Sequence, residues 1–343
     1  MADHPVPLLP DHPRLLPGLR VLRRDAAHLQ VGVGARAVLV PDHPDVRRLL
    51  GLLTSGAAPA AEHLPRPHTP AGEVLARLAG AGLLVDGAAL QTELHRSDAD
   101  PAGDPAAVAA AWCSDPGTAP QRWATRGRAQ LHLDVPTRDR PGLERLVAAC
   151  GLSVAPGPGD RSTATGSTAG GAPVLVVREQ EPAREELDRL QRDDVPHLLV
   201  RSELDRVVLG PFVAPGRTAC VRCLDAHAAD LDPRWPLLVE QLGRASTGAT
   251  PSDPAPRDPA LWQVALGWAV HDLVRWSEGR QPSTWSTTVT LGSSGSPQVQ
   301  VHRRHPRCGC GWADLGAAGR RHQKSESSLP SIERRFSREQ VSQ

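Results

Sequence analysis

The sequence predicts an α/β protein of two parts, in which a small α+β winged-helix unit precedes a larger α/β layer domain. Three observations lead to this prediction. Short strand-like runs followed by helices fill the first 90 residues, strands alternate with helices from residue 129 onward, and two compact cysteine pairs stand late in the chain. We place the winged-helix unit at 1–90, a linker at 91–125, the α/β domain at 126–315 and a disordered tail at 316–343.

The first unit opens with three strand-like runs that polar or glycine turns separate. A short helix over 45–53 follows them. A second helix begins after Thr69, which has the side chain of an N-cap residue and precedes a proline suited to the first helical position. Three strands, helices and a closing strand are typical of a winged-helix module, and the alternative that these elements cap a larger domain stays open. The strands are expected at 19–24, 28–33, 36–41 and 83–87.

The second domain begins with a strand, a loop and a helix, the unit from which α/β layers are built. Residues 91–121, rich in Ala, Asp and Pro, precede it as the linker, with one helix around 105–112. A glycine, serine and threonine loop at 156–171 interrupts the alternation of strands and helices. We expect strands at 129–135, 173–177 and 196–200, and helices at 143–150 and 182–192.

The end of the second domain contains a long helix and a hairpin. Asp258 and a following proline start the helix, which runs to 279 with apolar residues around much of its circumference. We interpret it as a core helix, with a ligand-stacking role for its tryptophans as the alternative. The hairpin joins 286–291 to 298–302, and a crossover at 243–257 precedes the helix.

Four of the six cysteines stand in two short clusters, Cys220-Val-Arg-Cys223 and Cys308-Gly-Cys310. Two thiolate pairs of this spacing can together complete a tetrahedron around one ion, which is the ligand set of a closed structural Zn²⁺ site. The alternatives are a disulfide or redox pair, unrelated loop cysteines, and His305 replacing one cysteine as a ligand. In the cytoplasm paired cysteines more often bind metal than form disulfides.

The composition excludes several classes of function. The net charge of +1 gives no electrostatic case for nucleic acid or an anionic membrane as partner, and no apolar run is long enough to cross a bilayer. The N-terminus has no secretory signal pattern, so the cytoplasm is expected. The only lysine is Lys324, in the predicted tail, so neither a Walker-type phosphate loop nor a Schiff-base lysine is expected in the folded body.

The turn after the first strand of the α/β domain lacks the features of a nucleotide cradle. An α/β nucleotide binder places a glycine-rich turn there, with backbone amides facing the phosphates. Residues 134–142 read Asp-Val-Pro-Thr-Arg-Asp-Arg-Pro-Gly instead, so prolines remove donors and charged side chains fill the space. Cys113 and Cys150 are interpreted as buried filler rather than nucleophiles. Asp225 and His227 suggest an acid/base pair, but we interpret them as neighbours of the metal loop or as solvent-facing.

The segments Gly-Pro-Phe-Val-Ala-Pro-Gly-Arg-Thr-Ala-Cys-Val-Arg-Cys-Leu at 210–224 and His-Pro-Arg-Cys-Gly-Cys at 305–310, with the element order between them, resemble the ThiF/MoeB-like E1 superfamily. The similarity is greatest to the E1-like cyclodehydratase C proteins, the leader-peptide-binding family of thiazole/oxazole-modified peptide biosynthesis. It covers roughly 128–313 and implies a degenerate Rossmann-like E1 domain. The first 90 residues resemble the winged-helix recognition element of those proteins. By this resemblance Cys220, Cys223, Cys308 and Cys310 bind a structural zinc.

The resemblance also implies a role. Proteins of this family bind the leader of a ribosomal precursor peptide by strand addition and present the peptide to a YcaO-type cyclodehydratase, which converts Cys, Ser or Thr to azolines. E1-like proteins tend to pair, so a homodimer stays open. The groove would be formed by an edge strand and a helix, and its candidate residues are Ala37, Val38, Leu39, Val40, Glu73 and Arg77.

Departures from the active E1 pattern favour a non-catalytic adaptor. An active E1 adenylates a carboxylate with a glycine-rich loop, a lysine, arginines and an aspartate that holds Mg²⁺. This chain has prolines and arginines in the loop, Arg178-Glu-Gln180 where the family's aspartates stand, and no lysine in the body, so ATP is not expected as a cofactor. The alternatives are a divergent adenylyltransferase acting on the C-terminus of a carrier protein, and a scaffold unrelated to peptide modification.

Overall fold

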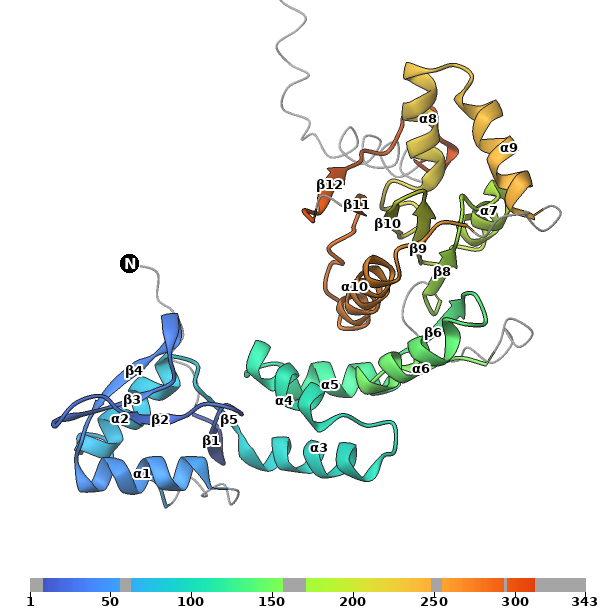
Figure 1. The fold of residues 1–343 in the computed structure, drawn as a ribbon. Coiled ribbons are helices and arrows are strands. Elements are labelled where there is room, and N and C mark those ends of the chain that lie inside the picture. Colours follow the sequence, from blue (N-terminus) through green and yellow to red (C-terminus); the bar gives the residue numbers. More distant parts are fainter. Residues whose placement is uncertain (1–8, 56–62, 157–170, 248–254, 293–294, 312–343) are drawn as a thin grey trace, which may run out of the picture. The chain divides into compact units, whose positions relative to one another are not determined.

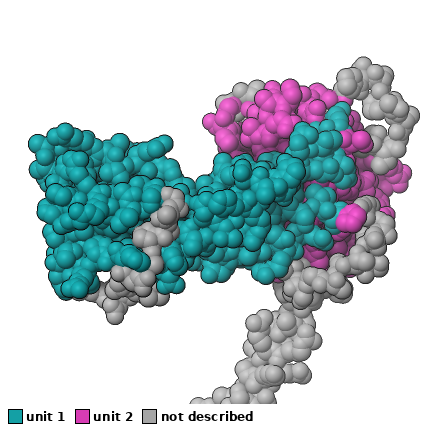
Figure 2. All heavy atoms as spheres, turned by 90° about the horizontal axis from the view of Figure 1, so that it is seen from below, with its two compact units in different colours: residues 1–130, 138–155, 274–280 teal, residues 131–137, 156–273, 281–343 magenta. Residues whose placement is uncertain are grey.

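The computed structural model describes residues 9–55, 63–156, 171–247, 255–292 and 295–311. These residues divide into two compact units (Figure 2). The first unit comprises 1–130, 138–155 and 274–280, and the second comprises 131–137, 156–273 and 281–343. The division differs from the predicted boundaries because the first unit extends well beyond residue 90.

The three predicted strand-like runs of the first unit form an antiparallel sheet in the order β2-β3-β4 (Figure 1). Each strand coincides with a predicted run: β2 is Val21–Arg23, β3 is His28–Val31 and β4 is Val38–Pro41. A separate two-stranded sheet pairs β1 (Pro13–Leu15) with β5 (Leu84–Asp86). The closing strand was predicted, but its partner β1 was not, and the short 3₁₀ helix η1 (Gly34–Arg36) precedes β4.

Helix α1 (Pro44–Thr54) begins and ends within one residue of the prediction, and α2 (Pro70–Gly80) begins at the predicted residue. The Thr69 hydroxyl accepts a hydrogen bond from the Gly72 amide at 3.1 Å, which satisfies one of the free amides of the first turn of α2. Gly72 itself is required by packing, because a Cβ atom there would stand 2.2 Å from the carbonyl oxygen of Arg66.

The stretch 91–125, expected to be a linker with one helix, instead folds as part of three helices. Leu90, Val108 and Trp112 belong to the same buried cluster as the core of the first unit, and this burial explains why the stretch is ordered. A fourth helix and the two-residue strand β7 (Ser153–Val154) follow. The helices are α3 (Gly87–Ala99), α4 (Pro105–Ser114), α5 (Ala119–Arg128) and α6 (Arg140–Ala149).

The main sheet is mixed and has the strand order β12-β11-β10-β9-β8-β6-β7. Strands β6, β8 and β9 are parallel, whereas β10, β11 and β12 add antiparallel. The three parallel strands are those predicted for an α/β layer domain, and the last two form the predicted hairpin. The bounds are β6 (Gln130–Asp134), β8 (Val174–Arg178), β9 (His197–Glu203), β10 (Arg206–Val213), β11 (Thr287–Leu291) and β12 (Gln298–Val301).

Four helices accompany these strands, and Figure 1 shows α10 on the opposite side of β9 and β10 from α8 and α9. Helix α10 is the predicted long core helix: Trp262, Ala265 and Ala269 are fully buried. Buried Asp272 ties it to the segment before β11, because its carboxylate accepts hydrogen bonds from the amides of Ser283 and Thr284 at 2.7 and 2.9 Å. The helices are α7 (Arg184–Arg192), α8 (Val221–Leu231), α9 (Trp235–Thr247) and α10 (Pro259–Ser277).

Several predictions concern segments outside the described residues: most of the 156–171 loop, part of the 243–257 crossover and the 316–343 tail. Within the described ranges, none of the helices has the length and hydropathy that a membrane crossing requires.

Candidate functional site

The structure brings together the four cysteines that the sequence pairs two by two. Cys220 is the N-cap of α8 and Cys223 lies in its first turn, whereas Cys308 precedes the 3₁₀ helix η4 (Gly309–Gly311) and Cys310 lies inside it. All four are free thiols whose sulfurs lie within 4.8 Å of one another. We call this group the cysteine cluster.

The spacing of the sulfurs in the cysteine cluster fits a tetrahedral metal ion. Zinc–sulfur bonds of about 2.3 Å place the sulfurs of a tetrahedron about 3.8 Å apart. The Cys220 sulfur lies 3.8 Å from that of Cys223 and 3.7 Å from that of Cys308, and the Cys223 and Cys310 sulfurs are 3.3 Å apart. These distances are far longer than a disulfide bond. The cluster can therefore bind a metal ion, with no ligand position left for water or substrate.

Hydrogen bonds set the protonation of the cluster. The Cys220 thiol donates to the Cys223 sulfur, and this contact, that with Cys310 and then burial raise the pKa of Cys220. Hydrogen bonds with Cys220 and Cys310 lower the pKa of Cys223. A bound divalent cation removes the cost of ionising the remaining thiols.

A set of hydrogen bonds fixes the segment that carries the second cysteine pair. His305 Nε2 lies 2.9 Å from a carboxylate oxygen of Asp230, and its Nδ1 accepts from the Arg307 amide. His227 packs edge-on against the His305 ring and its Nε2 lies 3.0 Å from the Arg303 carbonyl oxygen. His227, Asp230 and His305 thus form a second cluster of metal-ligating types. Both ring nitrogens of His305 have partners outside the cysteine cluster. His305 therefore does not replace a cysteine as a ligand of that cluster in this arrangement.

The predicted peptide groove residues lie on β4 and α2. β4 is an edge strand, and Val40 is buried whereas Leu39 is 37 % exposed. Ala37 precedes the strand, and Glu73 lies one turn before Arg77 on the exposed face of α2. The Arg77 guanidinium donates to the Leu39 carbonyl oxygen at 2.5 Å, so the structure joins the edge strand to the helix.

The direction of the backbone groups on β4 follows from two contacts. Successive residues of a strand direct their N–H and C=O groups to opposite sides. The Asp42 amide bonds the Ala27 carbonyl on the β3 side, and the Leu39 carbonyl instead accepts from Arg77. Leu39 therefore directs both backbone groups to the open edge, and Val38 and Val40 direct theirs to β3. The Ala37 carbonyl also faces the open edge, whereas the Ala37 amide donates to the Gly34 carbonyl in the preceding 3₁₀ helix.

The carboxyl ends of β6 and β8 are the place where α/β proteins bind nucleotides, and here an ion-pair network joins them. The Arg178 guanidinium contacts the Asp134 carboxylate at 2.7 Å and the Glu186 carboxylate of α7 at 2.8 Å. Burial opposes this charge, but Asp134 and Glu186 outweigh it and raise the pKa of Arg178. The predicted resemblance placed Arg178 where the E1 pattern has aspartates, but nothing in the sequence predicted that Arg178 joins these two carboxylates.

Cys113, Cys150 and Asp225, the remaining candidates from the sequence, have the surroundings of residues that stabilise the fold rather than react. Cys150 is half-buried and burial raises its pKa, as it does for Cys113, so neither thiol is activated. Asp225 is buried, and its carboxylate accepts hydrogen bonds from Nε and Nη2 of Arg184 at 2.7 and 2.9 Å rather than pairing with His227.

Neither a protein-family model nor a curated protein matches the chain, but solved structures do. A heterocyclase in complex with substrate and cofactor aligns with a TM-score of 0.58 and 20 % identity, over 87 % of this chain and 39 % of that one. The heterocyclase TruD aligns with 0.59 and 17 %, over 88 % and 43 %. The chain has the fold of these proteins.

The chain thus spans about two fifths of the length of the two heterocyclases. MccB of E. coli with ATP aligns with a TM-score of 0.52 and 13 % identity, over 87 % of this chain and 99 % of MccB. The predicted resemblance is thereby confirmed for the fold, including the mixed α/β sheet. The winged-helix identity of the first unit and the identity of the metal stay predictions.

Proposed function

We propose that this protein is a non-catalytic adaptor that binds the leader of a ribosomal precursor peptide and presents it to a YcaO-type cyclodehydratase for azoline formation. The observation that carries the proposal is the ion-pair network of Arg178 at the nucleotide end of the sheet. The structural neighbours support the proposal: two are heterocyclases, and the microcin C7 biosynthetic enzyme MccB has been solved in complex with N-formylated MccA.

The Arg178 network argues against adenylation in two ways. It fills the carboxyl ends of β6 and β8 with side chains that already satisfy one another. The loop that follows β6 leads to α6, whose second residue is Pro141, so one of the amides that would face a phosphate is missing. ATP chemistry in the complex is accordingly assigned to the YcaO partner.

The proposed leader site is the open edge of β4. An added strand would receive a hydrogen bond from the Leu39 amide and donate to the Ala37 carbonyl, while the Leu39 carbonyl exchanges Arg77 for the peptide. Glu73 and Arg77 would flank the peptide from α2, and the side chains of Val38 and Val40 would support the strand.

The proposed metal is structural Zn²⁺ in the cysteine cluster. Thiolates are soft ligands that select zinc among common divalent ions, and four of them close the coordination sphere. The role of the ion is to hold the start of α8 against the segment after β12. The Arg304 guanidinium, which bonds the Gly216 carbonyl at 2.6 Å, supports the same junction from outside the cluster.

The leader site is tested with Leu39→Pro. Proline removes the amide that faces the open edge and leaves the ladder to β3 intact, since Leu39 does not donate to it. The full-length chain is titrated with a fluorescein-labelled precursor peptide encoded beside a YcaO-type protein. We expect the affinity for the peptide to fall by about tenfold or more, because the variant loses one backbone hydrogen bond to the added strand.

Arg23→Pro is the matched control, because Arg23 lies on β2 at the opposite edge of the same sheet. It is expected to bind the peptide like the unaltered chain. Equal affinities of the two proline variants would exclude the β4 edge as the leader site.

A divergent adenylyltransferase acting on a carrier-protein C-terminus is the second candidate. It is favoured by the alignment with nearly the whole length of MccB, one structure of which contains ATP. ATP–pyrophosphate exchange by the purified chain, with and without a peptide, separates the two. ATP–pyrophosphate exchange that persists unchanged in the Arg178→Ala variant would support the adenylyltransferase and refute the non-catalytic adaptor.

A further inference from the structure

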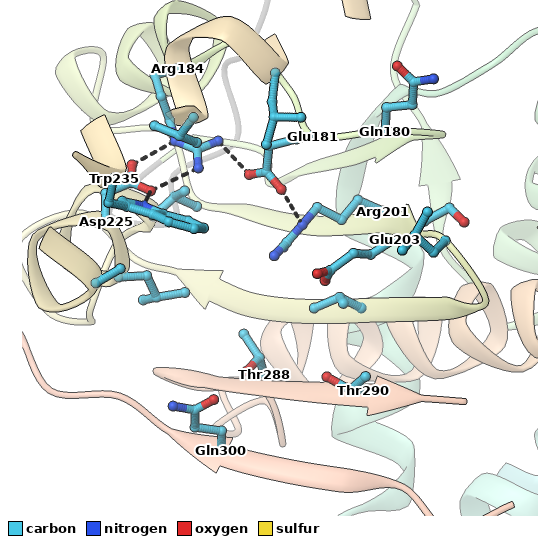
Figure 3. A pocket seen from close by; sticks show the side chains of 18 of the residues that line it. Gln180, Glu181, Arg184, Arg201, Glu203, Asp225, Trp235, Thr288, Thr290 and Gln300 are labelled. Atoms are coloured by element: carbon cyan, nitrogen blue, oxygen red, sulfur yellow. Dashed lines mark hydrogen bonds and ion pairs between the residues drawn. The ribbon is translucent and has the colours of Figure 1, made fainter. Parts of the chain in front are cut away.

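A cavity of about 650 Å³ lies in the second unit between the sheet and the helices α8 and α9 (Figure 3). Strands β9, β10, β11 and β12 line one side of it, and both helices line the other. Its size is within the range of sites that bind small ligands or short peptide segments. It shares no residue with the cysteine cluster, the Arg178 network or the β4 edge.

The strand side of the cavity is unusually polar for a sheet face under helices. Alternate residues of a strand face the same side, and such a face is normally apolar where helices cover it. Here Arg201 and Glu203 of β9, Thr288 and Thr290 of β11, and Gln300 of β12 line the cavity. This face therefore offers polar groups to a ligand between the sheet and the two helices.

The inner end of the cavity is a rigid charged network. Arg184 binds Asp225 through two hydrogen bonds and Glu181 through a contact of 2.6 Å, and Glu181 also contacts Arg201 at 2.7 Å. The Trp235 indole donates to Asp225 at 3.1 Å. Figure 3 shows these five side chains linked in one chain of contacts. Because Arg184 and Asp225 are buried, the network holds this wall in one arrangement.

The charge of the cavity is negative. Four carboxylates and two guanidinium groups line it, which leaves two negative charges in excess. Burial lowers the pKa of His302, so this ring adds no positive charge at neutral pH. Glu203 makes no side-chain hydrogen bond or ion pair within the described part of the chain, and the same holds for Thr290 and Gln300. These three side chains are available to a ligand.

The helix side offers exposed apolar surface. Leu231 at the end of α8 is 90 % exposed and Leu242 of α9 is 52 % exposed, although both line the cavity. Leu224 of α8 and buried Val239 of α9 also line the cavity. An occupant that fits must present a cation to the strands and apolar groups to the helices.

We propose that this cavity binds a peptide segment that carries a lysine or arginine side chain between apolar side chains, with Glu203 receiving the cation and Leu231 and Leu242 the apolar groups. Thr290 and Gln300 supply hydrogen bonds to its backbone. The site is independent of the proposed leader groove, and the inference does not rest on the proposed function.

The test uses the full-length chain and the probe acetyl-Ala-Leu-Arg-Leu-Ala-amide, titrated by calorimetry. Its control carries citrulline in place of arginine, which keeps the shape and removes the charge. We expect the arginine peptide to bind about fivefold more tightly, the upper range for an ion pair open to solvent. In Glu203→Gln the preference falls to about one, and in Leu231→Ser both peptides bind more weakly by a similar factor.

Glu144→Gln is the matched variant, because Glu144 is also an exposed carboxylate but lies on α6 outside the cavity. It is expected to keep the fivefold preference. Equal binding of the two peptides by the unaltered chain would overturn the proposal. So would a preference that survives in Glu203→Gln, or one that disappears in Leu39→Pro, which would assign the probe to the β4 edge instead.

Discussion

Replacing the second cysteine pair with serines, in the double variant Cys308→Ser/Cys310→Ser, should cost zinc and stability together. The cysteine cluster joins Cys220 to Cys308 across 88 positions of the chain. In the chain-entropy treatment of cross-links, closing a loop of this length stabilises the fold by about 4.5 kcal/mol. This is a large fraction of the roughly 5–15 kcal/mol that separates folded from unfolded domains.

The corresponding fall in melting temperature is roughly 10–15 °C for a domain of this size. It is measured by calorimetry, with zinc per chain determined by mass spectrometry on the same samples. Cys113→Ser/Cys150→Ser is the matched control, since it also removes two thiols but none from the cluster. It should keep one zinc per chain and lose at most about 2 kcal/mol. Loss of zinc with an unchanged melting temperature would refute the structural role.

Three further predictions concern buried charge and titration. Arg178→Met should lower stability by at most about 1 kcal/mol in urea titrations, since the partner carboxylates of Asp134 and Glu186 are 56 % and 36 % exposed and stay hydrated when the guanidinium is lost; a loss of several kcal/mol would contradict this. Burial lowers the pKa of His197 to about 4, below its unfolded value of 6.5, so its stabilising contribution is complete above pH 6.5 and is lost as the pH falls toward 4. The loss amounts to about 3 kcal/mol, and His197→Gln should flatten the pH profile of stability over that window. Asp272→Asn should lower the free energy of unfolding by about 2 kcal/mol, measured by chemical denaturation. Both carboxylate oxygens of Asp272 accept hydrogen bonds from Ser283 and Thr284, and the NH₂ group of an asparagine cannot accept one. A loss no larger than that caused by the same change at an exposed aspartate would contradict this.

The elements with strong local signals were predictable from the sequence. The three strands of the first sheet are bounded by turn residues, and Thr69 with Pro70 marks the start of α2 to the residue. Helices α3 and α5 were missed because the Ala, Asp and Pro content of 91–121 suggested a linker, whereas α4 coincides with the helix expected around 105–112. For α3 a signal was present nonetheless, because Asp86 caps this helix and its carboxylate accepts a hydrogen bond from the Ala89 amide at 2.9 Å.

The four residues of the cysteine cluster were predictable from the sequence, but the contacts that hold the segment around Cys308 in place were not. Spacing alone selects Cys220, Cys223, Cys308 and Cys310, since short pairs chelate wherever the fold places them. The contacts of His305 with Asp230 and of Arg304 with Gly216 join residues 75 and 88 positions apart, and no local pattern reports such a pairing. The cavity was missed for the same reason, because its polar strand face is assembled from three separate strands.

The position of Cys223 has a consequence for binding. The two residues that follow it on α8, Leu224 and Asp225, line the cavity, so one helical turn carries both a metal ligand and part of the proposed peptide site. Two ligands that favour the same placement of a helix are thermodynamically coupled, and the coupling is reciprocal. A peptide in the cavity should therefore slow the removal of zinc by a chelator, and loading with zinc should tighten the peptide by the same factor.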